Sequence, residues 1–219
     1  MGYIGFDTYI RANNASSWGT SSGGDTWTAA SSNGTVTLSI ISNTGLFNGV
    51  ASGTSNIQLI GAKTITDCEL LIKAEQNTVG GSSGFSLVAR SDGSNSSSAN
   101  HYRCSLTTQL SVSKSVSGTL TSLGTFALTV SNNVFYWVRF RVVGTALMAR
   151  TWQDGTSEPT TWQINVADSS LTSANQYGIR GFCSASGITV TVAHFEALDT
   201  NNSTIIYSAG SSSPGGVFS

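Results

Sequence analysis

Charged residues are scarce in this chain of 219 residues, since aspartate, glutamate, lysine and arginine make up only 10% of it. A typical soluble domain carries about 25%. Ten basic and eleven acidic residues leave a net charge of −1. This balance offers no basic surface for nucleic acid and no means of membrane insertion, so we expect neither as a partner. Solubility must come from hydroxyl and amide side chains, which favours a protein that works outside a cell.

Long apolar runs and helical periodicity are also missing. No stretch approaches the roughly 18 apolar residues of a membrane helix, and no segment repeats its apolar positions with helical spacing. The opening residues lack a basic segment followed by an apolar one, so we expect the chain to be made without a signal peptide. The three cysteines, an odd number, require no disulfide framework. We expect Cys68, Cys104 and Cys183 to be buried free thiols in strands.

Alternation of polar and apolar residues is the dominant pattern. β-Branched and aromatic residues recur at every second position in segments 35–40, 85–90, 110–114, 136–142 and 188–192, with Gly, Asn and Ser clusters between segments. This period is typical of half-buried strands, and a chain of this length can form one such domain. The sequence therefore predicts an all-β fold, an antiparallel β-sandwich of about a dozen strands.

The alternation decays after Asp199. Residues 200–219 are rich in Ser and Gly and hold Val217 and Phe218 near their end, a composition typical of flexible tails. We therefore divide the chain into a sandwich, residues 1–199, and a C-terminal tail, residues 200–219. The apolar pair suits a docking peptide, so we expect the tail to attach the protein to an assembly.

Five motifs follow one another between residues 136 and 199. They are the strands YWVRFRVV and ALMARTW, the stretch WQDGTSEPTTW, the strand YGIRGFC and the closing strand ITVTVAHFEALD. Together with the opening FDTY, their order resembles the laminin-G-like domains of the concanavalin A-like lectin/glucanase superfamily, of the kind found in bacteriophage virion proteins. The resemblance covers about residues 3–199 and implies a jelly-roll sandwich.

The resemblance implies fold more firmly than activity, because that superfamily contains lectins, hydrolases and structural modules. A virion protein is made inside a cell and works outside it, which fits a surface composition without a leader. We therefore expect a non-enzymatic adhesion or decoration component of a bacteriophage virion, such as a capsid, fibre or tail protein. Its expected partners are other virion proteins, cell-surface glycans and a second copy of the chain. The alternatives are a stand-alone carbohydrate-binding module and, third, a glycoside hydrolase.

Arginine and tryptophan alternate with aliphatic residues along several of these strands. If the strands are neighbours, one face results that offers planar donors and stacking surfaces to a glycan. The predicted ligand-binding residues of this face are Trp137, Arg139, Arg141, Arg150, Trp152 and Arg180. The alternative interpretation is a solvated outer sheet in which arginine stems cover the tryptophan rings.

The stretch WQDGTSEPTTW is unlike its surroundings, since two tryptophans enclose an Asp-Gly turn and a Glu-Pro pair. We expect Trp152 to end a strand and Asp154-Gly155 to form a turn. Glu158 is expected to accept hydrogen bonds from the backbone of the loop, and Trp162 to anchor the returning strand. The stretch is thus interpreted as a structural corner rather than as a catalytic loop.

Catalytic and metal-binding patterns are weak. A glycoside hydrolase needs two facing carboxylates, and the four glutamates have no suitable spacing, although Glu69 and Glu196 have the potential to face each other. His101 and His194 lie in strand sequence without a nucleophile motif, so no catalytic residue is predicted. We expect no cofactor and no metal. Calcium is the alternative, with the loop aspartates Asp25, Asp92, Asp154 and Asp168 as its ligands.

Overall fold

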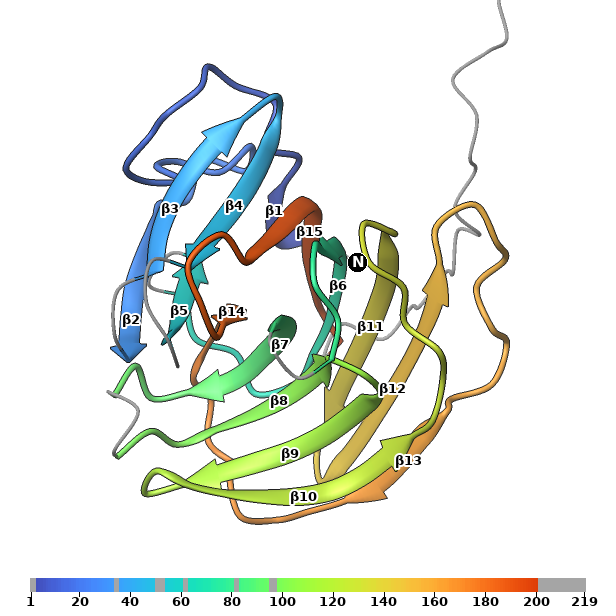
Figure 1. The fold of residues 1–219 in the computed structure, drawn as a ribbon. Helices are drawn as coiled ribbons and strands as arrows, with labels where there is room; N and C mark the ends of the chain where they lie inside the picture. The colour runs from blue at the N-terminus through green and yellow to red at the C-terminus, as the bar shows by residue number, and fades with distance from the viewer. Residues whose placement is uncertain are drawn as a thin grey trace, which may run out of the picture.

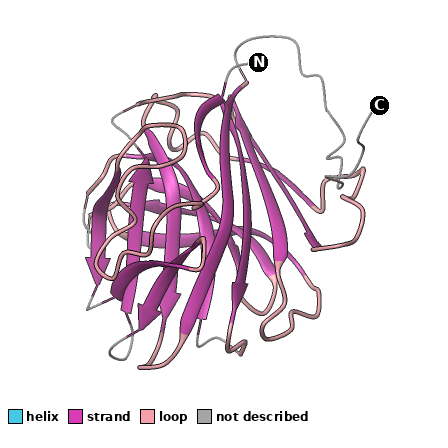
Figure 2. Cartoon of the chain, turned by 90° about the horizontal axis from the view of Figure 1, so that it is seen from above, coloured by secondary structure: helices cyan, strands magenta, loops and turns pink. Residues whose placement is uncertain are grey.

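The computed structural model describes residues 3–33, 36–49, 54–60, 63–80, 83–94 and 98–200, with the side chains of 31–33 and 54–59 excepted. These residues form fifteen strands and no helix, and Figure 2 shows the strands as two layers joined by loops. The prediction of an all-β antiparallel sandwich is confirmed. The expected number of about a dozen strands was too low, because several short strands near the N-terminus show little alternation of polar and apolar residues.

Eight strands form one sheet, in the order β13-β12-β11-β6-β15-β4-β3, with β1 pairing to β15 beside this path. Every pairing in the sheet is antiparallel. The strands are β1 (Tyr3–Asp7), β3 (Val36–Ile41), β4 (Thr44–Gly49), β6 (Cys68–Gln76), β11 (Tyr136–Val143), β12 (Ala146–Gln153), β13 (Ile164–Ala167) and β15 (Thr189–Asp199).

The other seven strands form the second sheet, in the order β10-β9-β8-β7-β14-β5-β2, again with antiparallel neighbours only. Figure 1 shows this sheet packed against the first. Its strands are β2 (Trp27–Asn33), β5 (Thr54–Ile60), β7 (Ser83–Ser91), β8 (His101–Leu106), β9 (Leu110–Val116), β10 (Thr119–Phe126) and β14 (Gln176–Cys183).

Side-chain alternation decides which residues fill the space between the sheets. On β11, Tyr136, Val138, Phe140 and Val142 are all buried, while the intervening residues face outward. The same period places Tyr102 and Cys104 of β8 in the core and turns their neighbours outward. Each sheet therefore has one apolar inner face and one outer face, and the outer faces carry the chemistry described below.

Gly181 of β14 lies directly against an aromatic ring of the opposite sheet. A Cβ atom at this position would overlap the ring of Phe47, which lies on β4 of the opposite sheet and is completely buried. The absence of a side chain at Gly181 thus makes room for an aromatic ring in the core. Phe47 in turn packs edge-on against Trp18, at 4.6 Å between ring centroids.

The FDTY segment is held by the buried carboxylate of Asp7. This carboxylate accepts a hydrogen bond from Trp27 Nε1 at 2.6 Å, one from the backbone N–H of Tyr9 at 2.8 Å and two from Arg11 at 2.8 Å. Burial alone would raise the pKa of Asp7, but the hydrogen bonds from Arg11 and Trp27 keep it below its ordinary value. This ionised group is one of the contacts that fix the start of the chain to the sandwich.

The three cysteines are free and buried, as predicted. Burial raises the pKa of Cys68 to about 12 and that of Cys183 to about 11, and raises the pKa of Cys104 further. They behave as small apolar residues of the core rather than as nucleophiles.

The predicted docking tail comprises residues 200–219, and all of it but Thr200 lies outside the described residues, so its role stays a prediction. Among the described residues, no helix has the length and hydropathy needed to cross a membrane.

Candidate functional site

Five of the six predicted glycan-binding residues come together on the outer face of the eight-stranded sheet. Trp137, Arg139 and Arg141 of β11 face outward and pair in register with Trp152, Arg150 and Met148 of β12. We call the five residues Trp137, Arg139, Arg141, Arg150 and Trp152 the Trp/Arg face.

The sixth predicted residue, Arg180, does not join this face. It belongs to β14, a strand of the seven-stranded sheet, and alternation turns it outward on the opposite side of the molecule. The expectation of a single face with six members is therefore wrong, because the strands 136–152 and 177–183 lie in different sheets.

The two tryptophans of the Trp/Arg face stack on each other. Their ring centroids are 6.1 Å apart and their planes differ by 11°. The indole Nε1 of Trp137 donates to Asp154 at 2.8 Å, and Lys73 of β6 pairs with the same carboxylate at 2.7 Å. Asp154 and Gly155 form the expected turn after β12, with Gly155 at a φ of 84°. The turn is thus fixed to the sheet through its own carboxylate.

Glu158 returns from the loop onto the same face, between two arginines. Its carboxylate accepts from Arg139 Nε at 2.6 Å and pairs with Arg150 Nη2 at 2.6 Å. Arg139 also pairs with Glu69 of β6. The expectation that Glu158 accepts from its own loop's backbone is wrong, since two guanidinium groups of the sheet are within reach and make stronger, charge-assisted bonds.

The remaining contacts of the loop also involve Arg150. Its Nη1 donates to the carbonyl of Pro159 at 2.9 Å, and the ring of Trp162 covers the guanidinium at 4.4 Å. Trp162 therefore anchors the loop, as predicted, but through Arg150 and from a partly exposed position. The stretch WQDGTSEPTTW is a structural corner that packs on the Trp/Arg face and pairs with two of its arginines, Arg139 and Arg150.

The loop aspartates considered for calcium are engaged separately. Each bonds to a different side chain: Asp25 to Lys63, Asp92 to Asn100, Asp154 to Lys73 and Asp168 to Lys114. Within the described ranges, no three His, Cys, Asp or Glu side chains are grouped closely enough to hold a metal ion.

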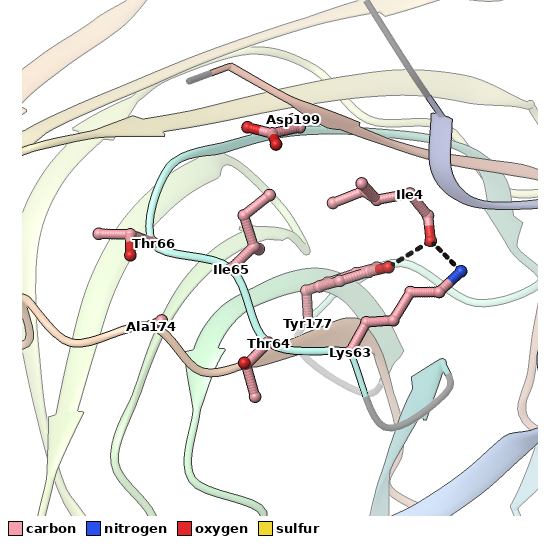
Figure 3. Close-up of a pocket in the computed structure, with 8 residues that line it drawn as sticks. All are labelled: Ile4, Lys63, Thr64, Ile65, Thr66, Ala174, Tyr177 and Asp199. Atoms are coloured by element: carbon pink, nitrogen blue, oxygen red, sulfur yellow. Dashed lines mark hydrogen bonds between the residues drawn. The ribbon is translucent and has the colours of Figure 1, made fainter. Parts of the chain in front are cut away.

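A hollow of about 340 Å³ lies at one edge of the sandwich, between β1 and the segments that precede β6 and β14. Figure 3 shows that the Lys63 ammonium and the Tyr177 hydroxyl both point at the carbonyl of Ile4. They donate to it at 3.0 Å and 2.7 Å, and Lys63 also pairs with Asp25. The polar groups of this hollow are therefore occupied in holding β1.

The seven-stranded sheet differs from its partner in charge. Its seven strands contain no aspartate and no glutamate, but they carry four basic residues, Arg90, Arg103, Lys114 and Arg180. Arg90 pairs with Asp67, and Lys114 pairs with Asp168. Arg103 and Arg180 are left on the outer face of a sheet that has no acidic residue.

These two arginines lie among serines. The register pairs Arg103 of β8 with Ser113 of β9 on one side and with Val88 of β7 on the other. Arg180 of β14 pairs with Ser86 of β7. The outward set, which we call the Ser/Arg face, consists of Ser86, Val88, His101, Arg103, Ser105, Ser111, Ser113, Arg180 and Phe182.

The floor of the Ser/Arg face is covered although it points away from the core. Val88 is fully buried, and Ser86 and Ser113 keep 1% and 6% of their surface exposed. The two arginine side chains stay partly exposed, and the guanidinium of Arg180 lies 5.5 Å from the ring centroid of Phe182. The guanidinium groups are therefore available to a ligand above a hydroxyl-lined floor.

Neither guanidinium group has a hydrogen-bond acceptor or a carboxylate partner within the described residues, and Arg103 Nε is buried without a partner. The undescribed stretches supply no side-chain carboxylate either, because their sequences contain no aspartate or glutamate. By contrast, seven of the ten lysines and arginines form ion pairs. Unpaired, partly buried charge is costly, and such groups gather at binding sites.

The mutual repulsion of these groups is visible in their proton affinities. Burial and the charge of Arg103 lower the pKa of Arg180 to about 9. Burial, with the charges of Arg103 and Arg180, lowers the pKa of His101 to about 4. His101 is 4% exposed, and both of its ring nitrogens lack a hydrogen-bond partner. Near neutral pH the Ser/Arg face thus carries two positive charges beside a neutral imidazole.

Sequence reasoning found Arg180 but missed Arg103 and His101. The signal was present, since segments 83–91, 101–106, 110–116 and 176–183 contain basic but no acidic residues. Recognising it requires the strand order, because these four segments become neighbours only in the folded sheet.

No family model and no curated protein matches the sequence. Among solved structures, carbohydrate-binding module CBM66 from Bacillus subtilis is similar at 14% identity and a TM-score of 0.60, over 78% of this chain and 94% of that one. The exoplasmic/lumenal domain of VIP36 in its Ca²⁺/Man-bound form matches at 11% identity and a TM-score of 0.61, over 85% and 87%. The β-glucanase of Bacillus licheniformis matches at 9% identity and a TM-score of 0.61, over 90% and 99%.

These structures have the concanavalin A-like lectin/glucanase fold, which confirms the fold expected from the sequence. At such identities the similarity concerns the fold alone, and that fold hosts binding proteins as well as hydrolases.

Proposed function

We propose that this chain is a non-enzymatic, carbohydrate-binding β-sandwich, and that its ligand lies on the Ser/Arg face. The observation that carries the proposal is the pair Arg103 and Arg180, two unpaired guanidinium groups above a floor of serines. Sugars are recognised through fixed planar donors and hydroxyl groups, and these are what the face offers. The similar structures described as a carbohydrate-binding module and as a Man-bound domain support the same class of ligand.

The Trp/Arg face is the weaker location, because two of its three arginines and the indole N–H of Trp137 are already bonded within the protein. Arg139 and Arg150 are bonded to Glu158, and the indole N–H of Trp137 is bonded to Asp154. A ligand there would have to compete with these intramolecular bonds. On the Ser/Arg face it would find donors without partners.

The contacts of the glutamates favour a binding role over hydrolysis. A glycosidase places two carboxylates across an open position that the sugar occupies. Glu69 and Glu158 are both bonded to Arg139, which fills the position between them. Glu196 is bonded to His194 on the same sheet. We therefore propose adhesion rather than cleavage, and a role in decorating a virion or another extracellular assembly stays within this proposal.

The test is retention of the protein on a panel of immobilised polysaccharides, with reducing ends measured in parallel. We expect retention on at least one polysaccharide without release of reducing ends. Arg180→Ala should abolish retention, whereas Trp137→Ala, on the opposite side of the molecule, should preserve it. Loss of retention in Trp137→Ala alone, or absence of retention on every polysaccharide, would overturn the proposal.

A further inference from the structure

We propose that the Ser/Arg face selects sugars that carry a negative charge, with Arg103 and Arg180 holding one carboxylate or sulfate group between them. This inference rests on the proposed function and names its class of ligand. It requires more than carbohydrate binding, because neutral sugars need donors and acceptors but no net positive charge.

The first argument is charge balance. The seven-stranded sheet has no acidic residue, and every side-chain carboxylate of the chain belongs to the described residues. None of them pairs with Arg103 or Arg180. No side chain of the described residues therefore supplies a paired counter-anion for these two groups.

The second argument is geometry. Arg103 and Arg180 lie on strands that flank β7, displaced along it by one outward-facing position, since Arg103 pairs with Val88 and Arg180 with Ser86. The charge of Arg103 acts on Arg180, so the two guanidinium groups lie near each other on this face. Two planar guanidinium groups match the oxygen atoms of one carboxylate or sulfate, each through paired hydrogen bonds.

The third argument is the surroundings of the two charges. The floor between them consists of Val88 and Ser86, and the hydroxyl of Ser86 is bonded to that of Ser105 at 2.8 Å. Buried His101 lies beside Arg103 on β8 with both ring nitrogens unpartnered. An anion above this floor would relieve the repulsion between the arginines.

Matched polysaccharides test the inference. Polygalacturonate and its methyl ester share one backbone and differ in negative charge, and dextran sulfate and dextran provide the same contrast for sulfate. We expect the protein to be retained by at least one charged polymer at least about tenfold more strongly than by its neutral counterpart. The two pairs show whether carboxylate or sulfate is preferred. Retention should weaken as salt is raised.

Variants then locate the binding. Arg103→Gln and Arg180→Gln should each weaken retention by about tenfold or more, and both should fold, because neither removes a side chain that forms an ion pair with another described residue. Arg141→Gln on the Trp/Arg face removes the same charge and is the matched control, which should bind as the wild type does. Thermal unfolding of all three variants verifies that they are folded.

The outcomes separate the two proposals. Equal retention on charged and neutral polymers overturns the inference and leaves carbohydrate binding intact. No retention on any polymer overturns both. Charge-dependent retention that is lost in Arg141→Gln but kept in Arg103→Gln and Arg180→Gln overturns the assignment to the Ser/Arg face.

Discussion

Arg103 and Arg180 lie on the same outward face of the seven-stranded sheet, and a single strand, β7, separates them. Two positive charges without a counter-ion cost stability in the ligand-free protein. We therefore predict that Arg180→Met raises the free energy of unfolding by about 1–2 kcal/mol, because it removes repulsion and keeps an apolar stem over Phe182. Urea denaturation of the wild type and of Arg180→Met, both without ligand, measures this difference in the free energy of unfolding.

Arg90 is the matched comparison for that experiment. Its guanidinium donates to three backbone carbonyls and pairs with Asp67, and its side chain is 1% exposed. Arg90→Met should destabilise the protein by about 3–5 kcal/mol, since it leaves those acceptors without a donor. If Arg180→Met destabilises to a similar extent, Arg180 is a structural residue and the Ser/Arg face loses its main support.

The buried imidazole of His101 predicts a pH dependence. Its pKa is lowered to about 4 by burial and by the charges of Arg103 and Arg180, against an ordinary value of 6.5. Above pH 6.5 the imidazole is neutral in both states and its contribution to stability is complete. As the pH falls from 6.5 towards 4, the unfolded chain binds a proton that the folded protein does not, so the free energy of unfolding decreases by up to about 1.4 kcal/mol per pH unit.

Replacing His101 isolates this effect. His101→Gln should flatten the stability profile between pH 6.5 and 4, as measured by urea denaturation at a series of pH values. His194→Gln, at the half-exposed histidine of the eight-stranded sheet, is the control and should keep most of the slope. An unchanged slope in His101→Gln would mean that His101 is protonated in the folded protein.

Glu158 links the loop 154–163 to the sheet, so we predict that its charge matters for stability. Glu158→Gln removes one carboxylate from two guanidinium groups, and Arg150 is largely buried. We expect the free energy of unfolding to decrease by about 1–3 kcal/mol. The partial exposure of Glu158 favours the lower part of this range. Glu75 lies on the same sheet and forms no ion pair with an arginine or lysine of the described residues, so Glu75→Gln should have a smaller effect in the same denaturation experiment. Polysaccharide retention should not change in either variant.

The fold was predictable because its signal is local. Alternation along 136–142 and 188–192 assigns inner and outer residues without knowledge of the partner strands, and Val138, Phe140 and Val192 are indeed buried. The three buried thiols followed from the apolar strand context of each cysteine.

The candidate site was less predictable because it depends on which strands are neighbours. Trp137 and Trp152 were grouped correctly, since a two-residue turn joins their strands. Arg180 was grouped with the wrong partners. It lies on β14, which is inserted between β7 and β5 of the seven-stranded sheet, and the sequence of β14 does not reveal that position. Arg103 on β8 and Arg180 on β14 share one face only because β7 lies between these two strands in the folded sheet.

The cysteines lead to a chemical prediction. Burial raises the pKa of each thiol, so little thiolate exists near neutral pH and no reagent reaches it. A thiol reagent such as Ellman's should react with none of Cys68, Cys104 and Cys183 in the native protein. It should react with all three in denaturant, and the native rate should follow unfolding. Rapid reaction of one thiol in the native protein would contradict its burial.

The contact between Gly181 and Phe47 predicts that a single methyl group added at Gly181 damages the core. A Cβ atom at Gly181 would overlap the Phe47 ring, which is enclosed by Trp18 and the opposite sheet and has no free volume to enter. Gly181→Ala should therefore destabilise the protein by about 3 kcal/mol or more. Gly155→Ala, at a positive φ with open space around it, should cost about 1 kcal/mol through backbone strain alone. If the double variant Gly181→Ala/Phe47→Leu is more stable than Gly181→Ala, the overlap with the Phe47 ring is the cause of the destabilisation. If the double variant is less stable than Gly181→Ala, the contact with Phe47 is not the reason that position 181 requires glycine.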